Sequence, residues 1–90
     1  MPVKRLSGRV TGLPEWSNSD RLRVARAALD ALVRQSTNVG HFDHLHRGDQ
    51  IDAATDLLAN VMHLCQQQSI DFEHCLELAR MHFGEEVVDG

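Results

Sequence analysis

The sequence predicts an all-α domain of three amphipathic helices, and three observations lead to that class. Apolar residues recur at intervals of three and four along three separate segments, which is the period of one helix face. Each segment follows short polar residues of the kind that cap a helix N-terminus. The second and third segments are separated only by "QQSID", a turn that predicts an antiparallel helical hairpin. Ninety residues are enough for one such domain but not for two cores.

The N-terminal part is predicted to be a basic arm followed by the first helix. Residues 1–16 contain glycines and a proline and lack a helical period, so we expect a loosely ordered arm with a short extended piece. Residues 17–90 then form the single helical domain. The first helix is expected at about residues 20–35, with Ser17 or Ser19 as its N-cap and Gly40 as its C-terminal stop. Its inner face is predicted to hold Leu22, Ala25, Leu29 and Leu32.

The second and third helices are predicted at about residues 50–67 and 72–84. Asp49 is the expected cap of the second helix and Asp71 that of the third. Cys65 and Cys75 lie almost symmetrically about the turn, where we expect them to be small buried apolar residues. The inner seams are predicted to consist of Ile51, Ala54, Leu58, Val61 and Cys65 on the second helix and Phe72, Leu76, Ala79 and Phe83 on the third.

Charge is divided unevenly along the chain. Residues 1–34 hold seven Lys/Arg and three Asp/Glu, a balance of +4, whereas residues 35–90 hold two and ten, a balance of −8. No apolar run approaches the roughly 18–20 residues needed to span a bilayer, and the N-terminus lacks the apolar core of a signal peptide. Two cysteines suit reduced thiols better than a disulfide scaffold. We therefore expect a cytoplasmic protein without a membrane segment.

The segment "GHFDHLHRGDQIDAATD", residues 40–56, holds three histidines and four aspartates. Imidazole and carboxylate are ligands for zinc and similar ions, but "HFDHLH" matches none of the established ligand spacings. We interpret the segment as a solvated loop leading into a helix start, where carboxylates favour the positive end of the dipole. The alternative metal ligands would be His41, Asp43, His44, His46, Asp52 and Asp56.

Catalytic and nucleic-acid signals are weak in this sequence. It has no nucleophile elbow and no phosphate-binding glycine loop, so no catalytic residue is assigned. The basic arm could follow phosphates, which keeps a nucleic-acid accessory role as an alternative. The third helix, however, would present Glu73 and Glu77 to a duplex, and such a face repels DNA. Nucleic acid is therefore not the expected partner.

One part of the chain resembles a known family. Within residues 52–86, "TDLLANVMHL", "SIDFEH" and "CLELARMHF" are similar to the last two helices of MazG-type all-α nucleotide pyrophosphatases. The resemblance implies a Mg²⁺-dependent enzyme in which Asp56 occupies the family's aspartate position. The family's preceding glutamate falls on Ala53, with Asp52 adjacent, and the first helix offers Asp30 alone toward the family's other ligands. The same segment is also similar to small uncharacterised helical proteins of bacteria and phages.

The function expected from these patterns is a non-catalytic protein-interaction or regulatory module, for example an inhibitor or regulator from a mobile element. The second helix is apolar over more than half its circumference and needs cover on two sides, which predicts a homodimer. Six histidines, all within residues 41–82, predict that association changes between pH 7.5 and 5.5. A basic protein partner is expected to contact an acidic, methionine-bearing surface formed by Asp52, Asp56, Asn60, His63, Met62 and Met81.

Overall fold

The computed structural model confirms the all-α, three-helix class and describes residues 16–37 and 40–89. Helix α1 spans Asn18–Ser36, a short 3₁₀ helix η1 spans Phe42–His44, α2 spans Arg47–Gln67 and α3 spans Phe72–Asp89. No strand occurs within these described ranges. The predicted arm lies outside them except for Trp16, which is half-buried.

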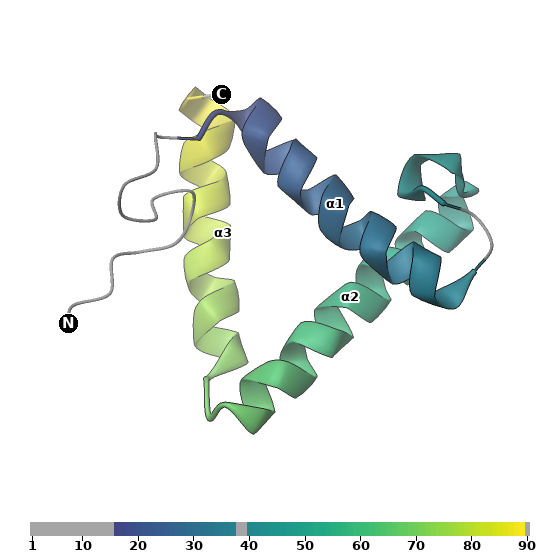
Figure 1. Ribbon diagram of the computed structural model, residues 1–90. Helices are drawn as coiled ribbons and strands as arrows, with labels where there is room; N and C mark the ends of the chain where they lie inside the picture. Colours follow the sequence, from purple (N-terminus) through teal and green to yellow (C-terminus); the bar gives the residue numbers. More distant parts are fainter. Residues whose placement is uncertain (1–15, 38–39, 90) are drawn as a thin grey trace.

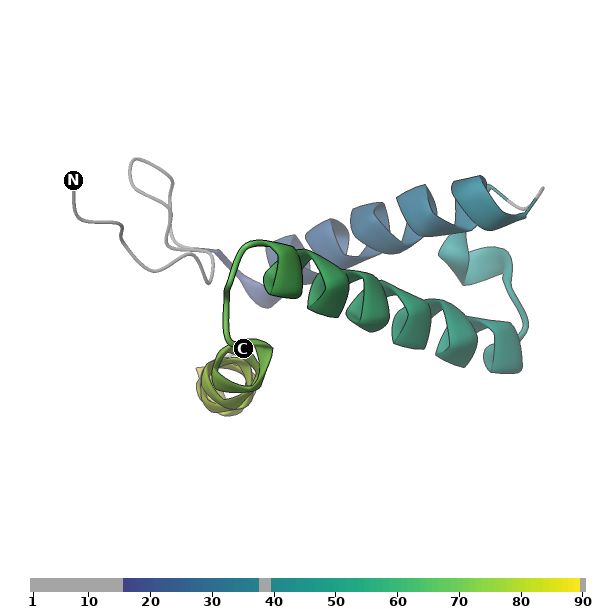
Figure 2. The same cartoon turned by 90° about the horizontal axis from the view of Figure 1, so that it is seen from below.

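The three helices form the sides of an open triangle (Figure 1). The second half of α1 crosses the first half of α2, and a short turn joins α2 to α3. At the remaining corner, the Asn18 side chain donates to the Glu86 carbonyl at 3.0 Å, and Arg21 lies 3.2 Å from the Glu86 carboxylate. Viewed from below, α1 and α2 lie in two layers, one across the other, and α3 is seen end-on (Figure 2). The helices therefore pack near the corners of the triangle.

Helix α1 begins after Ser17, which is one of the two residues predicted as its N-cap. The Ser17 hydroxyl accepts the Asp20 N–H at 3.2 Å, and the Asp20 carboxylate accepts the Ser17 N–H at 3.0 Å, which together form a capping box. These bonds hold the pKa of Asp20 below its ordinary value, the backbone bond from Ser17 being the largest cause. The C-cap is Thr37, so the prediction of Gly40 as the stop is wrong. Thr37 ends the helix in an extended conformation, its N–H still bonded to Val33.

Helix α2 begins earlier and α3 ends later than predicted. His46 is the N-cap of α2 and makes no side-chain capping bond, whereas Asp49 lies inside the first turn. The prediction of Asp49 as the cap is therefore wrong, although its carboxylate still favours the positive helix end. Helix α3 continues five residues past Gly84, where an added Cβ would meet open space. Nothing at Gly84 requires a left-handed turn, so the helix continues to Asp89.

The α2–α3 turn closes with a Schellman motif. Ser69 adopts a left-handed conformation, with φ 59°, and the Ile70 N–H donates to the Cys65 carbonyl at 2.8 Å. After the turn, the Asp71 carboxylate accepts the His74 N–H at 3.2 Å, which supports the predicted capping role of Asp71. The turn thus fixes how α3 leaves α2.

The apolar seams are covered only in part. Val33, Ala53 and Cys65 are the buried apolar residues of the described chain. Leu22 lies seven residues before Leu29 on the same face of α1, yet it is 57% exposed. The expected burial is wrong for the seam residues that the structure leaves exposed, and for Cys75; those seam residues are Leu22, Ala25, Ile51, Leu58, Val61, Ala79 and Phe83. The periodicity is that of a buried face, but the helices diverge from the corners and leave these positions without a neighbour.

Candidate functional site

The histidine-rich segment docks the α1–α2 connection onto α1. The Asp30 carboxylate accepts the Phe42 N–H at 2.8 Å, and its second oxygen lies 3.3 Å from His41 Nδ1. The Phe42 bond is the largest reason why the pKa of Asp30 lies below its ordinary value. Arg26 donates to Asp43 at 3.1 Å. Two aspartates, one on each side of the contact, thus fasten η1 to α1.

The remaining polar groups of the loop support the same arrangement. Gln50 donates to the Phe42 carbonyl at 3.2 Å, and the His44 ring lies edge-on to the His41 ring at 5.3 Å. His46 is exposed at the start of α2. Across the described ranges, no group of three or more His, Cys, Asp or Glu side chains is placed to hold a metal ion. Residues 40–46 thus form a connection that is hydrogen-bonded to α1 through η1, and residues 47–56 belong to α2.

The carboxylates that carry the pyrophosphatase resemblance do not gather in one place. Asp52 and Asp56 are both exposed on α2. Asp56 and Asp49 line a small hollow of about 250 Å³ between α1 and α2, and Asp52 is not among its lining residues. Asp30, the candidate from α1, is bonded to the Phe42 backbone instead. Asp49 lies one turn before Asp52 on α2, but across the described residues these carboxylates do not form a group of three placed to hold a metal ion.

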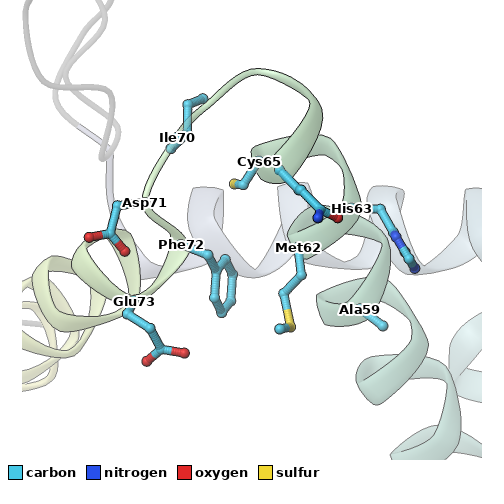
Figure 3. A pocket seen from close by; sticks show the side chains of 9 residues that line it. Ala59, Met62, His63, Cys65, Ile70, Asp71, Phe72 and Glu73 are labelled. Atoms are coloured by element: carbon cyan, nitrogen blue, oxygen red, sulfur yellow. The ribbon is translucent and has the colours of Figure 1, made fainter.

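The larger hollow lies beside the α2–α3 turn (Figure 3) and measures about 520 Å³. Its wall is apolar: Met62 and Ala59 come from α2, and Ile70 and Phe72 come from the turn and the start of α3. Figure 3 shows the Met62 and Phe72 side chains extending from opposite sides of the same opening. We name this concavity the turn hollow. It lies where α3 starts to diverge from α2, so its wall stays accessible.

The rim of the turn hollow is acidic. Asp71 and Glu73 line the hollow on the α3 side, and His63 lines it on the α2 side. No described cation pairs with Glu73, whereas Asp71 uses one carboxylate oxygen to cap α3. An apolar wall with negative charge at its edge matches a segment that carries apolar anchors and lysine or arginine.

Two of the six residues predicted to bind a partner, Met62 and His63, line this hollow. Asp52, Asp56 and Asn60 are exposed elsewhere on α2, and Met81 is exposed on α3. Ile70, Phe72 and Asp71 also line the hollow, although the sequence pattern predicts only a turn, a helix cap and an inner face for them. The sequence does show Ile70 and Phe72 as apolar residues on each side of the Asp71 cap, a pattern that marks a tight turn. What a single sequence does not contain is the angle at which α3 departs.

Comparisons with known proteins add no family assignment. No family model, no curated protein and no solved structure matches this chain. The resemblance to MazG-type pyrophosphatases accordingly stays a prediction. No helix in the described part of the chain is long and apolar enough to cross a membrane.

Proposed function

We propose that this chain is a non-catalytic protein-interaction module that captures a basic, apolar-anchored segment of another protein at the turn hollow. The observation that carries the proposal is the combination of an open apolar wall with an acidic rim. Met62 keeps 47% of its surface exposed and Ile70 keeps 48%, so both can still bury area against a partner. The free thiols of the chain suit a reducing compartment such as the cytoplasm.

Burial and charge have different roles in this proposal. Fully burying a large apolar side chain contributes about 1.5–3 kcal/mol, so two half-exposed anchors give a modest affinity. The rim carboxylates select the partner's charge and raise its association rate. Asp52 and Asp56 add to the same negative field from further along α2. Self-association, expected from the uncovered seams, is part of the proposal, and such a module can act as an inhibitor or regulator.

A designed helical peptide tests the proposal directly. The probe is a labelled leucine–lysine amphipathic helix of about 18 residues, and its control carries glutamate in place of lysine. At low salt, fluorescence anisotropy should show the basic peptide binding at least about tenfold more tightly than the acidic one. Equal affinity for both peptides, or no binding of either at about millimolar concentration, would contradict the proposed function.

Matched variants locate the binding site on the surface. Glu73→Lys should slow association about three- to tenfold, whereas Glu77→Lys, on the same helix but outside the hollow, should have a smaller effect. Met62→Gln should weaken binding about tenfold, while Met81→Gln should leave it unchanged. D52K/D56K should slow association with little loss of helicity, because both sites are exposed. Equal effects of the two members of a matched pair would place the site elsewhere.

A further inference from the structure

One exposed face of α3 carries a stripe of four residues in the order polar, apolar, apolar, polar. The order has the same pattern when it is read backwards, so the stripe can pair with a second copy of itself. His74, Leu78, Met81 and Glu85 follow one another at intervals of four, three and four, so they share one helix face. All four are exposed, with Leu78 at 39% and Met81 at 51%. None belongs to the turn hollow, and no described residue forms an ion pair with the two polar members. We name these four residues the α3 stripe.

The order along the stripe favours one particular arrangement of two copies. When two α3 helices align antiparallel, Leu78 of one lies opposite Met81 of the other, and His74 lies opposite Glu85. This follows because Leu78 and Met81 are centred on the same point of the helix as His74 and Glu85, between residues 79 and 80. Each contact then occurs twice, as a two-fold interface requires. A parallel alignment would instead set Glu85 against Glu85. The shared midpoint lies within one residue of the middle of α3, so the two helices can overlap along their length.

Resting on the proposed role as an interaction module, we infer that a second copy of this chain covers the α3 stripe, in an antiparallel two-fold dimer. Leu78 and Met81 form its apolar centre, and the paired His74 and Glu85 side chains flank that centre. The turn hollow takes no part in this contact. The dimer therefore leaves the turn hollow accessible on each copy, which makes the assembly bivalent toward a basic partner.

Helix α3 carries five acidic residues (Glu73, Glu77, Glu85, Glu86 and Asp89) and only one basic residue, Arg80, so like charge opposes the alignment to an extent that salt screens. Glu86 lies on another face and is paired with Arg21 of its own chain. Glu73 lies at the turn hollow. Glu77 follows His74 by three residues, at the edge of the α3 stripe, where water screens it. Within the stripe itself, the His74 ring of one copy faces the Glu85 carboxylate of the other, so a ring N–H can donate a hydrogen bond to that carboxylate.

The expected dimer is weak and depends on concentration. One pair of helices buries less than the roughly 800 Å² per partner of a standard interface. Sedimentation equilibrium over about 10 μM to 1 mM chain should therefore show dimerisation within the range. L78Q/M81Q should weaken it at least about tenfold, since each dimer loses two copies of both anchors. Met62→Gln, which changes the turn hollow, should leave the dimerisation constant unchanged.

Charge reversal tests the antiparallel register. His74→Glu and Glu85→Lys should each weaken the dimer, whereas H74E/E85K should recover most of the loss because a glutamate and a lysine then face each other across the interface. Circular dichroism confirms that each variant keeps its helices. A chain that is monomeric throughout this range, a dimer insensitive to L78Q/M81Q, or a double charge variant no better than either single one would overturn the inference. The peptide assay is independent, so binding of the basic peptide by a monomer would retain the proposed function and reject only the dimer.

Discussion

The α1–α2 corner and the α2–α3 corner are built from similar amphipathic helices but differ in how they are held. At the first corner, Val33 and Ala53 are buried and η1 is fastened to α1 by Asp30 and Asp43. At the second corner, Cys65 is buried near a tight turn, and the wall beside it stays open as the turn hollow. The first corner therefore has more buried apolar residues and is held by hydrogen bonds between its elements, whereas the second leaves apolar surface exposed.

This difference follows from the length and polarity of the two connections. The α1–α2 connection is long enough to include η1, whose backbone and side chains reach back to α1. The α2–α3 connection is short, and its hydrogen bonds serve the ends of its own two helices. A short turn fixes direction without covering the apolar surface on either side. An exposed apolar wall rimmed by charge is typical of an interaction surface.

The largest expected effect is a loss of stability when a buried valine of α1 is shortened, compared with an exposed valine of the same helix. Val33→Ala removes apolar volume from a side chain that is 2% exposed, so the free energy of unfolding should fall by about 1–3 kcal/mol. Val24→Ala, at a position that is 44% exposed, should change it by less than about 0.5 kcal/mol. Urea unfolding at one fixed protein concentration measures both. Equal losses would show that the burial of Val33 at the first corner does not contribute to stability.

The comparison also shows how much the sequence alone could predict. The three helices and the Ser17 cap follow from local periodicity and hydrogen-bonding chemistry. The cap of α2 did not follow, because His46 begins the helix without the side-chain bond by which a cap is recognised. The exposed seam at Leu22 and Phe83 did not follow either. Periodicity identifies which face is apolar, whereas helix crossing angles decide how far along that face a neighbour extends.

A second prediction concerns the turn that separates the two regions. Ser69 holds a left-handed conformation that costs an L-residue roughly 1–2 kcal/mol and costs glycine little. Ser69→Gly should therefore raise the free energy of unfolding by about 0.5–1 kcal/mol, after the entropy of glycine in the unfolded chain is included. Ser36→Gly, inside the last turn of α1, should lower stability by a similar amount. A loss at Ser69 would show that the turn is not strained.

The smallest expected effect is the pH dependence of the contact between η1 and α1. It tests whether the Asp30 carboxylate stabilises the folded state. Its folded-state pKa lies below the unfolded value, which is about 3.9 for an aspartate. The contribution to stability is therefore fully present above that value and is lost as pH falls through the folded pKa. Asp30→Asn keeps an oxygen that can accept the Phe42 N–H but removes the charge that titrates. Between about pH 5 and 3, urea midpoints of the wild type should fall more steeply than those of the variant.

Asp20, whose pKa is lowered by Ser17, adds a second contribution of the same sign, so D20N/D30N should give the flattest profile. If the Asp30→Asn profile is as steep as that of the wild type, the bond to Phe42 does not stabilise the folded state, and η1 must be held by the Arg26–Asp43 pair instead.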